Sequence, residues 1–211
     1  MATGTTASNT VRTGCESLPF VQTLAVDAPL EHTLIELSAV AEIVALGSDG
    51  PGAHRTLSAL IRRGHSNVAL IPKAARESRL PVAVLVDGVP SSEPAIRAAF
   101  DEASRRHVSL IAVHTWSEPG HLGLPAIGWS PIEWANNREQ EREVLAERLA
   151  GLQELYPDVP VHRITSSDSN FHPFTADPLS AQLVVVAVGA SRVSVIRRLT
   201  TIGVPVLVAK R

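Results

Sequence analysis

One pattern of segments occurs twice in the chain, and it constrains the fold more than any other feature of the sequence. An apolar strand at Ile43 to Gly47 is followed by an amphipathic helix and a second apolar strand at Val68 to Ile71. The same order returns at Val184 to Gly189 and Val206 to Ala209. Short apolar runs that alternate with helices are typical of parallel strands joined by right-handed crossovers. The repeat therefore predicts an internal duplication within a doubly wound, mostly parallel α/β fold.

The rest of the chain continues this alternation. Apolar and β-branched runs predict further strands at residues 20–26, 82–86, 108–113, 161–165, 183–188 and 204–209. Leucines at helical spacing predict the buried stripe of a long charged helix, at Leu145, Leu149, Leu152 and Leu155. Segments with many helix breakers or few apolar side chains should exchange their amide hydrogens fastest, at residues 1–18, 117–128 and 166–177.

Charge and cysteine content exclude several classes of function. The 19 Lys and Arg residues nearly balance 21 Asp and Glu residues, for a net charge of -2. Such a balance argues against nucleic-acid binding by bulk charge and against attachment to an acidic membrane. Cys15 is the single cysteine, which rules out an internal disulfide and a zinc site of the zinc-finger kind. The sequence has no apolar run of membrane-spanning length and no secretory signal, so we expect a cytoplasmic protein.

Two motifs and their spacing carry a resemblance to a known family. The first is Val-Leu-Val-Asp-Gly-Val-Pro-Ser-Ser at residues 84–92, where an Asp-Gly turn follows a strand. The second is Ala-Val-His-Thr-Trp at residues 112–116, which ends the next strand. Together they resemble the universal stress protein family. Two later segments, Leu183 to Gly189 and Val204 to Val208, look like the fourth and fifth strands of that family.

The resemblance implies a division of the chain. Residues 81–211 look like one nearly complete unit of the family, and residues 19–73 look like the back end of a preceding unit that lacks its first two strands. Residues 74–80 would be a linker and residues 1–18 a disordered tail. The chain therefore resembles a tandem universal stress protein with a truncated first half.

The same resemblance predicts how the two parts meet. In the family, the fifth strand of one unit pairs with that of its partner. We therefore expect Val68 to Ile71 to pair with Val204 to Ala209 inside one molecule, in the antiparallel sense, where they would cover a sheet edge. The family also implies a possible homodimer through the terminal strands.

Members of the family that bind ATP hold it above the carboxyl ends of the parallel strands, the expected crevice for this topology. Carried over to this sequence, the cofactor-binding positions are Asp87, Thr115, Val188 and Gly189. The family's phosphate loop reads Gly-x-x-Gly, nine residues, then Gly-Ser or Gly-Thr, because glycine backbone can approach phosphate oxygens closely. Without a ligand, Asp87 at a strand end would simply cap the following turn.

Both copies of the loop depart from this pattern. Gly189 is present, but Arg192 stands where the second glycine belongs, and the later glycines are missing. In the first copy Gly47 and Gly50 match the opening, yet Leu60 occupies the later glycine position. Both phosphate loops are therefore degenerate.

No catalytic machinery is visible in the sequence. His114 ends a buried strand, which favours a structural histidine. Three further histidines are scattered without ligand spacing, which favours surface positions for them: His121, His162 and His172. Three arginines lie at or just after the second degenerate loop: Arg192, Arg197 and Arg198. They either bind an anion or, more simply, form the solvent-exposed face of a short helix.

Two classes of function remain. The favoured one is a non-enzymatic regulatory or stress-response protein that lacks the family's usual ATP binding, needs no cofactor or metal, and acts through dimerisation or contacts with an unknown protein partner. The alternative is a protein that binds ATP with magnesium, or a cyclic nucleotide, in a reduced pocket. An enzyme of the wider nucleotide-binding α/β group ranks third, because paired catalytic carboxylates are missing.

Overall fold

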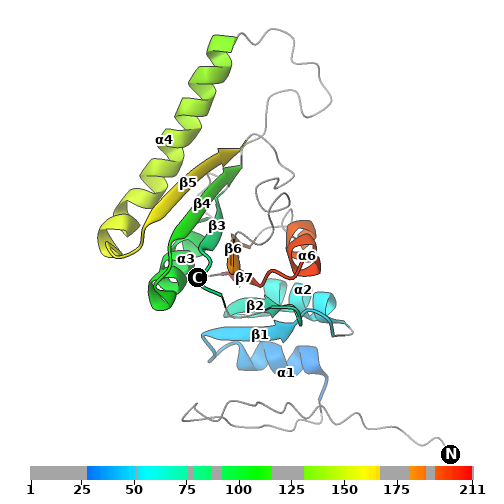
Figure 1. Cartoon of the computed structure of the whole chain (residues 1–211). Helices are drawn as coiled ribbons and strands as arrows, with labels where there is room; N and C mark the ends of the chain where they lie inside the picture. The colour runs from blue at the N-terminus through cyan, green and yellow to red at the C-terminus, as the bar shows by residue number, and fades with distance from the viewer. Residues whose placement is uncertain are drawn as a thin grey trace, which may run out of the picture.

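The computed structural model describes residues 28–50, 52–75, 78–86, 92–115, 131–166, 181–188 and 193–210. Their strands form one seven-stranded sheet in the order β1-β2-β7-β6-β3-β4-β5, which Figure 1 shows from β5 at the top to β1 at the bottom. The strands are β1 (Ile43–Gly47), β2 (Asn67–Ile71), β3 (Val82–Val86), β4 (Leu110–Thr115), β5 (Val161–Ser166), β6 (Leu183–Ala187) and β7 (Val206–Ala209). The helices are α1 (Leu30–Leu37), α2 (Ala53–Arg63), α3 (Glu93–Arg106), α4 (Pro131–Leu155) and α6 (Val193–Thr201).

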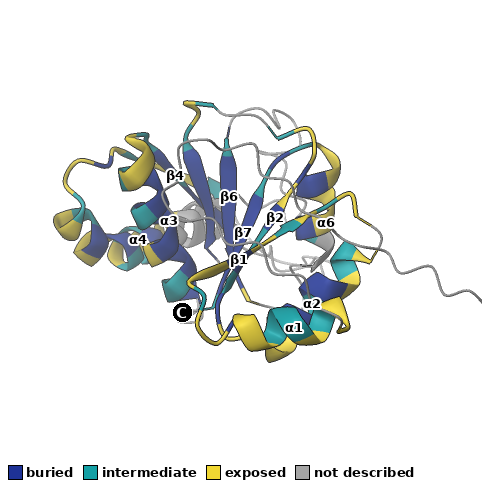
Figure 2. Ribbon diagram, turned by 90° about the horizontal axis from the view of Figure 1, so that it is seen from below, coloured by how far each residue is buried: buried dark blue, intermediate teal, exposed yellow. Residues whose placement is uncertain are grey.

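Helices cover the sheet from both sides, which gives two hydrophobic cores. Side chains of α3 and α4 pack on one face, and side chains of α2 and α6 pack on the other, with α1 beside α2. Figure 2 shows these two layers on either side of the sheet. Alternate residues of β3 and β6 enter alternate cores, so both strands are buried along their whole length. The predicted α/β fold with a mostly parallel sheet is confirmed.

The pairing between β2 and β7 joins the two copies of the repeated segment. It is antiparallel, and Val68 lies opposite Val208 while Leu70 lies opposite Val206. The other pairings in the sheet are parallel. The predicted contact between these two strands is therefore confirmed in partner and in direction.

Strand β7 has a neighbour on each side. Because β7 pairs with β6 on one edge and with β2 on the other, both of its edges are occupied within the chain. The expected homodimer through the terminal strands stays a prediction.

Two strands begin two residues later than the sequence pattern predicts. Before β4, His107 adopts a left-handed conformation (φ 52°) and the Val108 amide donates to the Ala103 carbonyl at 3.1 Å. Before β7, Gly203 does the same (φ 87°) and the Val204 amide donates to the Leu199 carbonyl at 3.1 Å. In both places the first apolar residue caps the preceding helix in a Schellman motif and cannot begin the strand.

The leucine stripe of α4 is correct except at its end. Leu145, Leu149 and Leu152 are buried, whereas Leu155 is 61% exposed. The helix ends at Leu155, and the ring of Tyr156 stacks on Phe100 at 5.5 Å between centroids. This tyrosine covers the core at the place where the sequence predicted a fourth leucine.

Several predictions concern residues outside the described part of the chain. These are the strand at residues 20–26, the tail at residues 1–18, and the fast exchange of residues 117–128 and 167–177. They stay predictions.

Candidate functional site

The carboxyl ends of four neighbouring parallel strands form the edge where a site is expected. In the register of β3, β4 and β5, Val86 lies opposite His114, and His114 lies opposite Thr165. On the other side of β3, Leu85 lies opposite Val186 of β6. Polar residues placed at these four ends share one edge of the sheet.

The four residues predicted to bind a cofactor belong to this edge by their place in the chain. Thr115 is the last residue of β4 that pairs with β5, where it lies opposite Ser166, and Val188 directly follows β6. The Val188 amide donates to the Ala209 carbonyl at 3.3 Å, so β7 holds the end of β6. Asp87 and Gly189 lie outside the described residues, each one residue beyond a described strand segment.

His114 connects two of these strand ends. Its ring is buried, and its Nδ1 donates to the carbonyl oxygen of Val86 at 3.0 Å, which assigns the proton of a neutral ring to Nδ1. The bond holds the last residue of β3, which directly precedes Asp87 in the chain. This geometry agrees with the predicted structural role of the histidine.

The connection between β6 and α6 occupies the place of the family's phosphate loop. Strand β6 ends at Ala187 and α6 begins at Val193, so only residues 188–192 separate them. The nine residues 193–201, where the long loop would run, are helical. Ile196 and Leu199 from this helix are buried in the core. Backbone amides that lie inside a helix already donate to the helix and cannot also surround a phosphate.

In the first copy of the repeat, the corresponding connection is the loop between β1 and α2, and it is closed in a different way. After β1, the Ser48 amide donates to the Ile71 carbonyl at 2.9 Å, and the Asp49 carboxylate accepts from the Lys73 amide at 2.6 Å. Gly52 has a φ of 81°, which a glycine adopts without strain, and α2 starts at the next residue. Leu60 of α2 is fully buried. The loop after β1 thus bonds to the end of β2, and a core leucine stands at the later glycine position.

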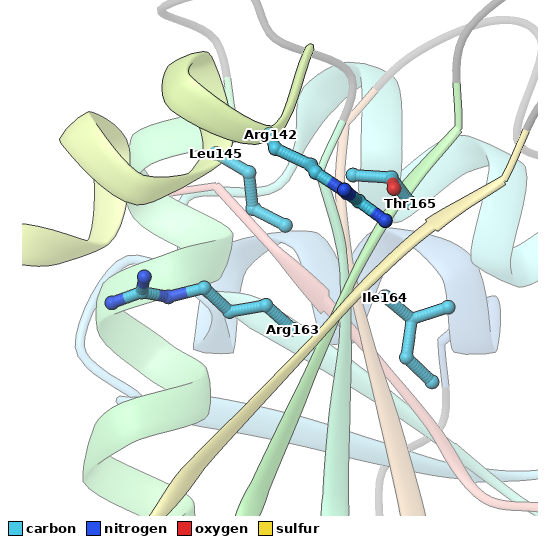
Figure 3. A pocket seen from close by; sticks show the side chains of 5 residues that line it. All are labelled: Arg142, Leu145, Arg163, Ile164 and Thr165. Carbon is cyan, nitrogen blue, oxygen red and sulfur yellow. The ribbon is translucent and has the colours of Figure 1, made fainter. Parts of the chain in front are cut away.

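A pocket of about 440 Å³ lies between α4 and β5, and sequence reasoning missed it. Its lining is Arg142, Leu145, Arg163, Ile164 and Thr165. Figure 3 shows Arg142 reaching from α4 toward Thr165, while Arg163 points away from Thr165. Arg142 contacts Glu139 at 3.2 Å, and Arg163 donates to Gln153. Both guanidinium groups therefore have partners on α4.

The remaining candidate residues are dispersed. Arg197 and Arg198 are exposed on α6, as expected for residues that solvate a helix, and His162 is exposed on β5. Arg192, His121 and His172 lie outside the described residues. Within the described ranges, three or more His, Cys, Asp or Glu side chains nowhere gather as metal ligands would. None of the helices in that part of the chain is long and apolar enough to cross a membrane.

Comparison with known proteins places these features in one family. The profile of the universal stress protein family matches residues 79–199. Universal stress protein Rv1996 of Mycobacterium tuberculosis is 42% identical over 163 residues, which cover 73% of this chain and 51% of that protein. Universal stress protein Rv2005c of the same organism is 45% identical over 168 residues, which cover 73% of this chain and 54% of that protein. The chain thus spans about half the length of these relatives.

Solved structures agree on the fold. A putative universal stress protein from Pseudomonas aeruginosa superposes with a TM-score of 0.55 at 17% identity, covering 88% of this chain and 69% of that one. A universal stress protein from Archaeoglobus fulgidus superposes with a TM-score of 0.52 at 15% identity, covering 86% and 65%. With the matched profile and the M. tuberculosis relatives, these observations establish that the chain belongs to the universal stress protein family.

Proposed function

We propose that this protein is a non-enzymatic, cytoplasmic regulatory or stress-response protein that does not bind ATP in the usual way of its family and acts through contacts with other proteins. One observation carries the proposal. Helix α6 begins at Val193, six residues after the last residue of β6, and it fills the place of the phosphate loop with a helix whose Ile196 and Leu199 belong to the core. Unwinding this helix to surround a triphosphate would expose both side chains to water.

The electrostatics of the edge support the same proposal. Asp87 follows β3 directly, and a carboxylate there repels a triphosphate unless a cation or backbone donors offset the charge. In the first copy, the Asp49 carboxylate already accepts a hydrogen bond from the Lys73 amide, which ties the loop after β1 to the residues that follow β2. Neither copy offers the row of glycine amides that phosphate binding in this topology uses.

Two observations support treating residues 19–73 as a shortened first unit, 74–80 as a linker and 81–211 as a nearly complete unit. The segment β1-α2-β2 has the same order as β6-α6-β7, and β2 meets β7 in the antiparallel sense. Two units related by a twofold axis between their last strands would produce this sheet order.

Binding of ATP with magnesium, or of a cyclic nucleotide, is the second candidate. The strand register favours it, because β3, β4 and β6 bring the ends of three strands, and with them the positions next to Asp87, Thr115 and Gly189, to a single edge of the sheet. A smaller ligand would need fewer backbone donors than a triphosphate.

Calorimetric titration of the full chain with ATP, ADP and cyclic AMP, with and without magnesium, separates the candidates. We expect affinities weaker than about millimolar, or roughly 4 kcal/mol of binding free energy. The matched control is Asp87→Ala, which removes the carboxylate but leaves the loop unchanged. Micromolar ATP affinity that is lost in Asp87→Ala would overturn the proposal and establish the nucleotide-binding candidate.

A second experiment tests the reason for the weak binding. A complete Gly-x-x-Gly, nine-residue, Gly-Ser loop grafted between Gly189 and Val193 should create measurable ATP affinity. If the graft folds and binds no nucleotide, the missing loop is not the reason, and the explanation based on α6 fails.

A further inference from the structure

Strand β1 has a free edge in the described part of the chain. Its ladder partner there is β2, on one side. Along the strand, Val44 is buried while Ile43 is 36% exposed and Ala45 is also exposed. Unpaired amide and carbonyl groups on a sheet edge are a template for another strand, and folded proteins usually cover or pair such an edge.

Helix α1, which lies beside this edge, is also incompletely covered. None of its residues is buried, and Leu30 is 54% exposed. Val40, in the turn between α1 and β1, is 88% exposed. Leu34 and Ile35 nevertheless pack against the core beneath α2, and Glu31 pairs with Arg55 of α2 at 3.0 Å. The helix is therefore fixed on one face of the sheet, with apolar side chains exposed next to the β1 edge.

The handedness of the chain decides where the segment before α1 belongs. The crossover from β1 through α2 to β2 joins parallel strands, and α1 lies on the same face of the sheet as α2 (Figure 1). Crossovers between parallel strands are right-handed in nearly all proteins. Two right-handed crossovers on one face step across the sheet in the same direction. A strand that enters β1 through α1 must therefore lie on the side of β1 away from β2, which is the free edge.

We propose that the free edge of β1 is the docking site of residues 20–26 of this chain, which add a strand parallel to β1. This segment, Phe-Val-Gln-Thr-Leu-Ala-Val, is the apolar run that precedes α1, and residues 27–29 connect it to the helix. Seven residues in a strand span about 23 Å, enough to follow the five residues of β1. A parallel strand ends at the carboxyl end of β1, where an antiparallel α1 begins, so a connection of three residues suffices.

Hydrogen exchange measured by NMR tests the proposal. Every second amide of β1 points away from β2, and these amides are protected only if something pairs with the free edge. We compare the full chain with Thr23→Pro, which removes an amide donor and the strand geometry in the middle of the segment. Thr10→Pro, earlier in the same terminus, is the matched control.

We expect the outward amides of β1 to exchange at least tenfold faster in Thr23→Pro than in the unchanged chain and in Thr10→Pro, with the inward amides unaffected. Exchange at unprotected rates in the unchanged chain would overturn the proposal. Sedimentation of the same samples identifies a different occupant. Outward amides whose protection rises with protein concentration, in step with a dimer and independently of Thr23→Pro, would assign the edge to a second copy and overturn the proposal as well.

Discussion

The segments β1-α2-β2 and β6-α6-β7 share one topology, but their first strands are buried to different extents in the sheet. Each begins with a strand of five mostly apolar residues and continues through an amphipathic helix to a parallel strand. Strand β6 lies between β3 and β7 and is buried throughout, whereas β1 has one described neighbour and is buried only at Val44 (Figure 2). The burial of these two strands therefore depends on their position in the sheet more than on their apolar content.

The helices of the two segments do not show this difference. Leu57 of α2 is 1% exposed and Leu199 of α6 is 2% exposed, and both belong to the same core. The helix ends differ again. After α6, Gly203 has a left-handed conformation, whereas Gly64, directly after α2, has an ordinary extended one.

The two segments are joined by more than the β2-β7 ladder. The Lys210 ammonium group, directly after β7, donates to the Leu60 carbonyl at 3.0 Å and to the Gly64 carbonyl. The Lys210 amide donates to Asn67 Oδ1 at 2.9 Å. A cation at the carboxyl end of α2 also interacts favourably with the helix dipole. The end of one copy therefore caps the helix of the other.

The largest expected effect comes from placing a charge in each of the two strands. Val185 of β6 and Ala45 of β1 lie on the same face of the sheet, but only Val185 is buried beneath α3 and α4. Val185→Asp should lower the free energy of unfolding by about 4 kcal/mol or more, because an unpaired carboxylate would be buried. Ala45→Asp should cost less than about 1 kcal/mol. Denaturant unfolding measures both values, and similar losses for the two variants would break the comparison.

Truncating the core leucine of each helix should affect the two segments equally. Leu57→Ala and Leu199→Ala each leave a cavity in the same core, and each should cost about 3 kcal/mol. The measurement is again denaturant unfolding. A loss for Leu57→Ala of less than half that for Leu199→Ala would show that the first segment contributes little to the stability of the fold, despite its buried helix.

The two helix ends should respond differently to asparagine. Asparagine tolerates the left-handed conformation of Gly203, so Gly203→Asn should cost less than Gly203→Ala, for which we expect about 1 kcal/mol. At Gly64 a Cβ would lie 2.7 Å from the Leu60 carbonyl oxygen, so Gly64→Asn should cost as much as Gly64→Ala. Thermal or denaturant unfolding of the four variants gives the test. A rescue by asparagine at Gly64 would contradict the steric explanation.

The smallest effect is spectroscopic and provides a control for the other variants. Tyr156 is the single tyrosine of the chain, and its hydroxyl donates to the Asp101 carboxylate, which raises the pKa of Tyr156 above its usual value near 10. Burial raises this pKa further. Because the folded-state pKa is raised, the bond stabilises the fold below about pH 10, and this contribution is lost as the pH rises through the folded-state pKa.

Phenolate absorbance of the folded protein reports this titration directly. Asp101→Ala should lower its midpoint toward the usual value. Ala45→Asp, at the far edge of the sheet, should leave the midpoint unchanged. A midpoint that moves in Ala45→Asp would show that the β1 edge and the α3-α4 layer are coupled.

Local patterns in the sequence account for most of the elements. Continuous apolar runs predicted β3 and β6, and leucine spacing predicted the buried stripe of α4. The pairing of β2 with β7 came from the family resemblance, since no local pattern specifies which distant strand is a neighbour. The starts of β4 and β7 were predicted two residues early, because an apolar residue such as Val108 or Val204 can cap a helix as well as begin a strand.

The candidate site, too, could be predicted only in part from the sequence. Sequence motifs predicted Asp87 and Thr115 as binding residues, and the strand register brings the ends of β3 and β4 to one edge. The pocket lined by Arg142 and Thr165 had no local signal, because its walls come from α4 and β5, which are separate elements. Similarly, the bond between Asp49 and the Lys73 amide joins two loops that only the β1-β2 pairing brings together.

By itself, the sequence determined which segments of the described chain are strands and helices and their order, because periodicity and turn residues act over a few neighbouring positions. Its motifs pointed to the family by resemblance. Only the tertiary structure decided which strand faces are buried and which groups meet across the sheet. Ile43 and Leu183 begin equally apolar strands, yet Ile43 is exposed and Leu183 is buried, because burial depends on the neighbours that the whole chain supplies. For the same reason, Lys210 caps a helix that ends at Arg63, far from it in sequence and adjacent to it across the β2-β7 pairing.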